Sequence, residues 1–400
     1  MINGLDSYKA KWNIQTDASI KPGLDAITAA LEELGDPHKK GQFVHLAGTN
    51  GKGSTAAMLK SILREHGLSV GNFYSPAIFD IHDQIQLNGT PVTPQQLDEA
   101  MKQLANLQTP LTDFELLTAA AFLVFNKFAP DVAIIEAGMG GRFDSTNVID
   151  PIISIIPSIS YDHTNFLGET IEDITWHKAG IIKKWKPVII GDLPAEARDI
   201  IHATADELHA EVIEARQRIN AVLKLKGKHQ LQNAGLAIEA AQELLQLEYN
   251  AQKAEKGLEK AAIPNRFEEV FPNVIFDGAH NEASIDALAA AIKEEYPNRS
   301  IHIIMGVLKD KNYVQILRRF EEVSGRFTFV DFPFERALPA ESLFSESKSK
   351  IKTIRTLYDI LPVQDENEVT IVTGSLYLLT AIRNSNYKLF QNYSTASKEL

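Results

Sequence analysis

The chain contains no cysteine among its 400 residues. This excludes a disulfide framework, a thiolate nucleophile and any cysteine-based metal site. It fits a reducing compartment, and we expect a cytoplasmic protein. The sequence also has no apolar run long enough to cross a bilayer, and its opening stretch, MINGLDSYKAKWNIQ, lacks the apolar core of a signal peptide. We therefore expect no membrane partner.

Positive charge is scarce. The 40 lysines and arginines stand against 52 aspartates and glutamates, which gives a net charge of −12. Basic residues are scattered, apart from a small cluster at Lys183–Lys186. Nucleic acid is therefore not expected as a partner. If the substrates are anions, a few side chains, backbone N–H groups or metal ions must supply positive charge locally.

Apolar strand-like runs alternate with helical patterns along the whole chain, as is typical of a parallel sheet covered on both faces. The length favours two domains. The predicted strands of the first part are residues 43–48, 131–138, 151–159 and 186–192, and its predicted helices are 54–67, 113–128, 230–247 and 250–262. After a break at residues 263–266 the pattern resumes with strands at 273–280, 300–307, 326–332 and 369–375 and a helix at about 284–296.

These patterns predict an α/β protein of two domains. We expect residues 1–263 to form an N-terminal domain with a mostly parallel sheet, which the glycine-rich loop at residues 45–55 makes a P-loop-type ATPase domain, and residues 264–400 to form a smaller, Rossmann-like α/β domain. The second part has no phosphate loop of its own, so we expect it to complete a site at the interface.

A glycine-rich loop, HLAGTNGKGST at residues 45–55, joins the first predicted strand to a helix. Glycines let successive N–H groups converge on phosphate, the helix N-terminus adds positive potential, and Lys52 adds a point charge. The hydroxyl of Ser54 is placed to join a magnesium shell. The spacing departs from the common phosphate loop, because only Thr49 and Asn50 separate Gly48 from Gly51. A plain glycine-rich turn is the alternative interpretation.

Seven segments together resemble the folylpolyglutamate synthase and dihydrofolate synthase family of the Mur ligase superfamily, which are ATP-dependent amide-forming ligases. They follow in family order and cover nearly the whole chain: AGTNGKGS (47–54), FELLTAAAF (114–122), IEAGMGGRFDSTNVI (135–149), DHTNFLGETIEDI (162–174), HKAGIIK (177–183), NRFEEV with VIFDGAHN (265–281), and VTGSLYLL (372–379).

The resemblance implies a nucleotide site that draws on both domains. The positions matching ATP-binding residues are Gly48, Thr49, Asn50, Gly51, Lys52, Gly53 and Ser54 of the loop, together with Asn233, Arg266 and Asp277. His280, with Asn281, matches a position beside the phosphate to be transferred, and we assign Lys52, Lys178 and His280 as catalytic. Domain closure over this site would exclude water.

The resemblance also implies two magnesium ions. Glu136, at the end of an apolar strand, matches a ligand of one ion, and His163 matches a ligand of the second. Ser54 and Ser75 match residues that help to hold the first ion. The alternative for Glu136 is a solvated acid at a strand end, which the glycine-rich continuation disfavours. For His163, spacing alone favours a structural histidine, since magnesium prefers oxygen ligands.

Lys178 matches a lysine that is carbamylated in this superfamily, which replaces a cation by an extra carboxylate beside the metals. Spacing alone favours an ordinary surface lysine. The pterin-bearing substrate of the family contacts positions that match Thr112, Asp113, Phe114 and Glu115, and also Phe143 and Asp144. The aromatic residues would otherwise be interpreted as core.

These parts imply a reaction in which ATP phosphorylates a substrate carboxylate and L-glutamate attacks the acyl phosphate to give an amide. The expected substrates are a folate or dihydropteroate, L-glutamate and ATP, and we expect a monomer. A Mur-type ligase for a non-folate carboxylate is the alternative within the superfamily. A P-loop kinase or GTPase and an inactive nucleotide-binding protein are alternatives of other classes.

Several positions depart from the family pattern. Ala77 stands where the family usually has histidine, Gln84 where it has arginine, and His177 where it has glutamate. Asn265 and Glu282 replace a glycine and a proline. The losses lie mainly near the expected substrate loop, so the ligation chemistry is better supported than the identity of the substrate.

Overall fold

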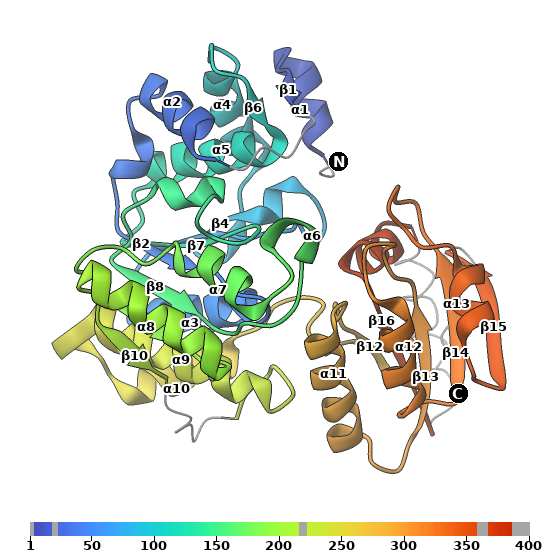
Figure 1. Cartoon of the computed structure of the whole chain (residues 1–400). Helices are drawn as coiled ribbons and strands as arrows, with labels where there is room; N and C mark the ends of the chain where they lie inside the picture. Colours follow the sequence, from blue (N-terminus) through green and yellow to red (C-terminus); the bar gives the residue numbers. More distant parts are fainter. Residues whose placement is uncertain (1–3, 18–22, 216–221, 358–366, 386–400) are drawn as a thin grey trace. The chain divides into compact units, whose positions relative to one another are not determined.

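The computed structural model describes residues 4–17, 23–215, 222–357 and 367–385. Contacts between residues divide the chain into two compact units (Figure 1). The first unit comprises Met1–Lys224 and Gln230–Ala262, and the second comprises Leu225–His229 and Ile263–Leu400. None of the helices in the described ranges is both long and apolar enough to cross a membrane.

The first unit is built on an eight-stranded sheet in the order β10-β9-β8-β2-β7-β3-β4-β5. Its strands are β2 (Phe43–Leu46), β3 (Val70–Phe73), β4 (Ile85–Leu87), β5 (Thr90–Pro91), β7 (Val132–Glu136), β8 (Ile153–Ile156), β9 (Val188–Ile190) and β10 (Val212–Glu214). All neighbours pair in parallel except β3 with β4 and β4 with β5. A separate parallel pair joins β1 (Thr16–Asp17) to β6 (Leu111–Thr112).

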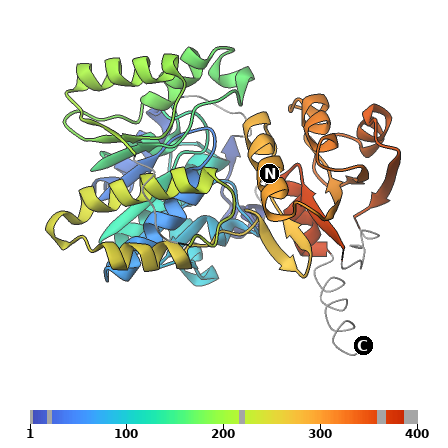
Figure 2. The ribbon, with the colours of Figure 1, turned by 90° about the horizontal axis from the view of Figure 1, so that it is seen from below.

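Helices cover both faces of this sheet (Figure 2), because its central strands are apolar on both sides. The helices are α1 (Leu5–Trp12), α2 (Asp25–Glu33), α3 (Lys52–Glu65), α4 (Pro94–Leu104), α5 (Asp113–Phe128), α6 (Thr164–Leu167), α7 (Ile171–Ala179), α8 (Ala195–Leu208), α9 (His229–Leu245) and α10 (Ala251–Lys260). Short 3₁₀ turns lie at Pro37–Lys39, Ile81–Gln84, Ser145–Val148 and Gln246–Glu248. In Figure 2, α8 lies on one side of the strands, and α9 and α10 lie on the other.

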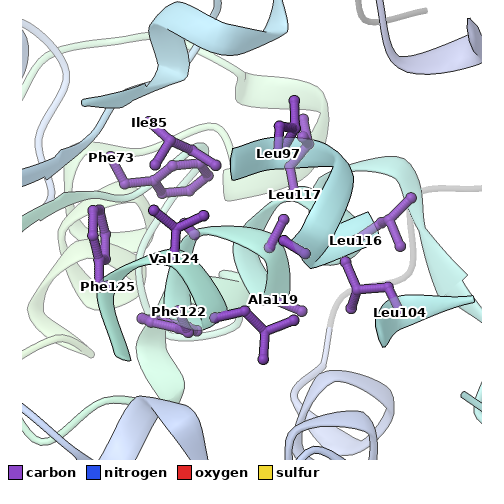
Figure 3. Close-up of a cluster of buried hydrophobic side chains, with 14 of the residues drawn as sticks. Phe73, Ile85, Leu97, Leu104, Leu116, Leu117, Ala119, Phe122, Val124 and Phe125 are labelled. Carbon is purple, nitrogen blue, oxygen red and sulfur yellow. The ribbon is translucent and has the colours of Figure 1, made fainter. Parts of the chain in front are cut away.

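The largest cluster of buried apolar side chains in this unit packs α5 against its neighbours (Figure 3). Phe122 and Phe125 of α5 meet Phe73 of β3, Ile85 of β4 and Leu97 of α4 in that cluster. Each such side chain contributes roughly 1.5–3 kcal/mol when it is fully buried. This packing fixes the N-terminus of α5, which carries the predicted substrate segment, relative to the sheet.

The second unit has a six-stranded sheet in the order β11-β12-β16-β13-β14-β15, in which only β11 and β12 are antiparallel. Its strands are β11 (Glu268–Phe271), β12 (Val274–Phe276), β13 (Ser300–Met305), β14 (Arg326–Asp331), β15 (Ile351–Thr356) and β16 (Glu368–Thr373). Helices α11 (Glu282–Glu295), α12 (Tyr313–Glu321) and α13 (Ala340–Glu346) share one core cluster with the sheet. Residues 376–385 are helical. They pack in a second core cluster against strand residues that alternate with those of the first cluster, such as Ile304, Val330 and Val372. The predicted α/β class, with two mostly parallel sheets, is confirmed.

The predicted start of one helix that matters for the site was wrong. The helix after the phosphate loop begins at Lys52 and not near Ser54. Gly51 has a left-handed φ of 87° and serves as the N-cap, so the helix starts immediately after it. Lys52 therefore belongs to the first helical turn.

Candidate active site

Three loops meet at one edge of the first sheet because β8, β2 and β7 are adjacent and parallel. Ligands of such sheets bind at the carboxyl ends of the strands, where the chain order switches direction. A pocket lies there. It is lined by Gly48, Thr49, Lys52, Ala137, Gly138, Met139, Gly140, Asp162, His163 and Lys178. The structure thus brings together five predicted site residues from three separate parts of the chain.

The phosphate loop is held by the segment that follows β8. The N–H of Thr49 donates to the carbonyl of Ser158 (2.9 Å), and the N–H of Asn50 donates to the Ser158 hydroxyl (2.9 Å). The Thr49 hydroxyl donates to the carbonyl of Ser160 (3.0 Å) and accepts from its N–H (3.0 Å). A side chain on Gly48 would be crowded, since a Cβ would lie 3.0 Å from the ring of Pro157 and 3.3 Å from the carbonyl oxygen of Ser158. The loop conformation is therefore fixed by the protein itself, as preorganised anion binding requires.

Asn233 of α9 lies against this loop. A Cβ on Gly51 would be 2.5 Å from Asn233 Oδ1, and the Asn233 amide nitrogen donates to Gln230 Oε1 (2.9 Å). The predicted nucleotide-binding asparagine is thus placed beside the phosphate loop. Gly51 must be glycine for two reasons, its left-handed backbone and this close approach.

Lys52 lines the pocket, and the carboxylate of Glu136 lies beside it. The Lys52 ammonium donates to the carbonyl of Gly48 (2.9 Å) and lies 3.9 Å from Glu136 Oε1. Glu136, the last residue of β7, is only 6% exposed. A buried carboxylate beside a lysine at the mouth of a phosphate loop can serve a nucleotide and its metal ion together.

The donors available for a metal ion are few. The described residues contain no group of three or more His, Asp or Glu side chains close enough to hold an ion by themselves. Mg²⁺ does not require such a group, because it is usually bound by one or two carboxylates, water and substrate phosphates. Glu136, with Asp162 and His163 on the pocket wall, fits that pattern. Ser54 is buried in the first turn of α3 and Ser75 is half-buried after β3, and neither lines the pocket.

Lys178 is not an ordinary surface lysine. It lies in the last turn of α7 and is 4% exposed. Burial lowers the pKa of its ammonium group to about 7, with a further lowering by Lys52 that Asp162 and Asp144 partly oppose. Near neutral pH a substantial fraction of this amine is therefore uncharged and nucleophilic.

Two residues of the predicted substrate segment cap α5. The Thr112 hydroxyl accepts from the N–H of Glu115 (3.3 Å), and Glu115 Oε2 accepts from the N–H and hydroxyl of Thr112 (both 2.8 Å), which together form a capping box. Asp113 Oδ1 accepts from the Lys9 ammonium (2.9 Å) and the Thr16 hydroxyl (2.6 Å). These contacts give all three residues a role in holding the N-terminus of α5.

Phe114 and Asp144 meet at Gly138, which lines the pocket. A Cβ on Gly138 would lie 2.6 Å from the Phe114 ring and 3.3 Å from Asp144 Oδ2. Phe114 also stacks on Phe73, with 5.9 Å between ring centroids. Asp144 is buried, which raises its pKa, and it accepts from the N–H of Met139 (2.8 Å). Both side chains therefore contact the loop that follows β7 and help to fix its conformation.

Phe143 lies outside that contact, in an exposed aromatic group. Its side chain is 43% exposed, and its ring lies 5.9 Å from Trp176 and 5.8 Å from His177. His177, one of the departures from the family pattern, is thus part of an aromatic cluster rather than an acidic site. Gln84, another departure, is buried, and its amide donates to the carbonyl of Tyr74 (3.2 Å). That position offers no charge to an anionic substrate.

The second unit gathers its own predicted residues around the end of β12. Asp277 Oδ2 accepts from the N–H of Phe267 (2.8 Å) and Asp277 Oδ1 from the N–H of Ala279 (2.9 Å). Burial raises the pKa of Asp277, while Arg266 lowers it. The Arg266 guanidinium lies near Gly278, and His280 Nδ1 is 2.8 Å from the Gly278 carbonyl oxygen. Arg266, Asp277 and His280 therefore form one group.

Three features of the site were not predicted. Asp162 lines the pocket beside His163, Gly138 forms the contact between Phe114 and Asp144, and Ser158 holds the phosphate loop. Asp162 was within reach of sequence reasoning, since it follows an apolar strand. Ser158 was not, because nothing in the sequence shows that the β8 segment borders the first loop.

The chain is similar to known proteins over nearly its full length. Residues 46–196 match the Mur ligase middle domain, and residues 265–376 match the Mur ligase glutamate ligase domain. The chain is 38% identical to the dihydrofolate synthase/folylpolyglutamate synthase of Bacillus subtilis, over 91% of this chain and 95% of that protein.

Solved structures agree. E. coli FolC in complex with DHPP and ADP superposes with a TM-score of 0.85 at 26% identity, over 98% of both chains. The bifunctional folylpolyglutamate synthase/dihydrofolate synthase of Yersinia pestis, complexed with AMPPNP and a Mn ion, gives a TM-score of 0.83 at 25% identity, over 95% of this chain and 97% of that one. Together with the site geometry, these similarities show that the chain belongs to the folylpolyglutamate synthase/dihydrofolate synthase family of the Mur ligase superfamily.

Proposed function

We propose that the chain is an ATP-dependent ligase that adds L-glutamate to the carboxylate of a folate or of dihydropteroate through an acyl phosphate. The observation that carries this proposal is the pocket that the phosphate-loop Lys52 and the buried Lys178 line together with Asp162 and His163. A nucleotide-binding protein without chemistry would not need a buried lysine beside its phosphate loop.

The reaction needs activation because a carboxylate is a poor acyl electrophile. Transfer of the γ-phosphoryl group of ATP to the substrate carboxylate creates a leaving group, and the amine of glutamate then displaces phosphate. The N–H groups of Thr49 and Asn50 donate to Ser158, so Lys52 and the N–H groups at the N-terminus of α3 are the ones that bind and orient the phosphates. The fixed loop geometry lets these groups act without rearrangement.

Glu136, Asp162 and His163 are the residues that would hold magnesium, and Ser54 and Ser75 belong to this proposal through the family resemblance. The ion, when bound, neutralises charge on the phosphates. The neutral fraction of Lys178 at pH near 7 supports its carbamylation by carbon dioxide, which would place a negative charge beside these donors.

The remaining assignments follow the same logic. Phe114, Gly138 and Asp144 are proposed to border the pterin-bearing substrate, with Thr112, Asp113, Glu115 and Phe143 near it. Asn233 of the first unit and Arg266, Asp277 and His280 of the second are proposed to serve ATP. We also propose that the enzyme is a cytoplasmic monomer. Light scattering of the purified protein measures its mass in solution and so tests whether it is a monomer.

The test combines the protein with ATP, Mg²⁺, L-glutamate and either dihydropteroate or tetrahydrofolate, with products identified by mass. We expect a product heavier than the acceptor by one glutamyl residue, and phosphate release that requires both acceptor and glutamate. A Lys52→Met variant is the control, and it should fold but release about 10²–10³-fold less phosphate. Release that needs no glutamate would contradict the proposal and indicate a kinase. Product formed only with a non-folate carboxylate would indicate the other Mur-type activity.

A further inference from the structure

The turn that carries Arg266 has an unusual backbone. Asn265 and Phe267, on either side of Arg266, have positive φ values of 61° and 45°. Residues other than glycine seldom adopt this region, and a bulky residue such as Phe267 is strained there. Two of them around one functional arginine mean that surrounding contacts hold the turn in place.

Hydrogen bonds from backbone N–H groups connect the turn to the loop after β12. The N–H of Phe267 donates to Asp277 Oδ2 (2.8 Å), and the N–H of Gly278 donates to the carbonyl of Asn265 (2.8 Å). The N–H of Asn265 donates to Glu268 Oε2 (2.7 Å). The positions of Arg266 and Asp277 are therefore coupled.

The side chain of Asn265 is held by an arginine from the other end of the unit. Arg383, in the helical segment 376–385, donates from Nε (3.1 Å) and from one terminal nitrogen (3.0 Å) to Asn265 Oδ1. The same terminal nitrogen donates to Glu268 Oε2 (2.5 Å). Asn265 is fully buried and Arg383 is 9% exposed, with its guanidinium 5.2 Å from the ring centre of Phe276. A guanidinium fixed by packing and by two acceptors is a rigid anchor.

We infer that Arg383 is a positioning residue for Arg266, acting through Asn265 and Glu268. The inference rests on the proposed role of Arg266 in binding ATP. A glycine at position 265 would accept the left-handed backbone but would offer no side chain to the anchor. Asparagine provides both the left-handed backbone and a side-chain acceptor for Arg383, since it is among the residues that best tolerate this conformation.

Steady-state kinetics of the full-length enzyme test the inference. We expect Arg383→Met to raise the KM for ATP about tenfold, as for loss of a buried charged hydrogen bond, with kcat at saturating ATP changed less than about twofold. Arg383→Lys should recover part of this loss, because an ammonium group keeps the positive charge but not the planar pair of N–H donors of the guanidinium. The matched control is Arg326→Met, which removes an arginine paired with Glu368 (3.0 Å) in the same unit and should leave the KM for ATP unchanged.

A double-mutant cycle with Arg266→Ala separates an effect on the position of Arg266 from a general loss of stability. If Arg383 acts through Arg266, adding Arg383→Met to the Arg266→Ala variant should raise the KM for ATP by less than about twofold. A full tenfold rise in that background, or no rise in the wild-type background, overturns the inference.

Amide hydrogen exchange provides a readout that does not depend on ATP. The N–H groups of Phe267 and Gly278 should exchange at least about tenfold faster in Arg383→Met than in Arg326→Met. Unchanged exchange overturns the inference. If Arg266→Ala leaves the KM for ATP unchanged, the proposed role of Arg266 fails, and exchange alone decides whether Arg383 holds the turn.

Discussion

Replacement of Lys178 by methionine should change how stability depends on pH. Lys178 is 4% exposed, and burial lowers its pKa from 10.5 to about 7. At 1.36 kcal/mol per pKa unit, keeping the unmodified side chain charged in the fold costs about 5 kcal/mol relative to the unfolded chain. Methionine has a similar length and no charge, so it removes this cost while it keeps most of the packing.

The sign follows from proton binding. Between pH 7 and 10.5 the unfolded chain keeps the lysine proton, whereas the folded protein has released it. Stability rises with pH wherever the unfolded state binds more protons. The destabilisation is therefore full below about pH 7 and disappears as the pH approaches 10.5. Between about pH 7 and pH 9, the free energy of unfolding of the wild-type protein should rise by about 2 kcal/mol more than that of Lys178→Met.

Urea denaturation followed by tryptophan fluorescence measures this difference. The three tryptophans, Trp12, Trp176 and Trp185, all belong to the first unit, so their signal reports the unit that contains Lys178. The buffer must be free of carbon dioxide, and Lys184→Met serves as the control because Lys184 is exposed. An equal pH dependence in wild type and Lys178→Met would refute the reasoning, since the buried amine would then carry no proton linkage.

The same variant tests carbamylation without any activity measurement. Carbon dioxide that reacts with the native amine acts as a ligand of the folded state and must raise stability. Bicarbonate added at about pH 8 should therefore stabilise the wild-type protein and Lys184→Met, and leave Lys178→Met unchanged. A bicarbonate effect of equal size in all three proteins would show that it acts elsewhere. Small carboxylates should likewise restore part of the activity of Lys178→Ala.

Two further predictions concern glycines of the site. Gly51→Ala should lower the free energy of unfolding by about 2–5 kcal/mol, because Gly51 has a φ of 87° and an added Cβ would lie 2.5 Å from Asn233 Oδ1. The control Gly67→Ala should lower it by only about 1–2 kcal/mol, because Gly67 has a similar φ of 96° but no atom within 4 Å of an added Cβ. Equal losses in urea denaturation would show that the contact is absent. Gly138→Ala should raise the KM for the pterin-bearing substrate about tenfold and that for ATP less than twofold, because its Cβ would lie 2.6 Å from the Phe114 ring. Phe114→Leu should recover part of this loss, and equal changes in both KM values would remove Phe114 from the substrate site.

The sequence predicted most of the central architecture, because each central strand or helix has a clear local signal. The helix predicted at 113–128 is α5 with the same bounds, and the strand predicted at 300–307 contains β13. Two strands were missed for different reasons. β15 (Ile351–Thr356), at the edge of the second sheet, has a half-exposed, mixed pattern that resembles a loop. β3 (Val70–Phe73) lies inside the first sheet, between β7 and β4, but it is short and interrupted by Gly71.

The limits of the site prediction have a different cause. Local motifs identify which residues end a strand or open a helix, and this placed Lys52 and Glu136 correctly at the sheet edge. They do not give the order of strands in the sheet. The adjacency of β8, β2 and β7 brings Ser158 to the phosphate loop and Lys178 to Lys52, and it is a property of the tertiary fold.

The electrostatics of the pocket suggest why a modifiable lysine lies there. In an acidic chain of net charge −12, a phosphate site needs local cations, and Lys52 beside the loop supplies one. A second ammonium buried at Lys178 is unfavourable, since Lys52 is one of the two causes that lower its pKa. Loss of the proton relieves the repulsion, and the proposed carbamylation would go further by making the second charge negative. The same wall can then hold a divalent ion and still leave Lys52 free of a competing cation.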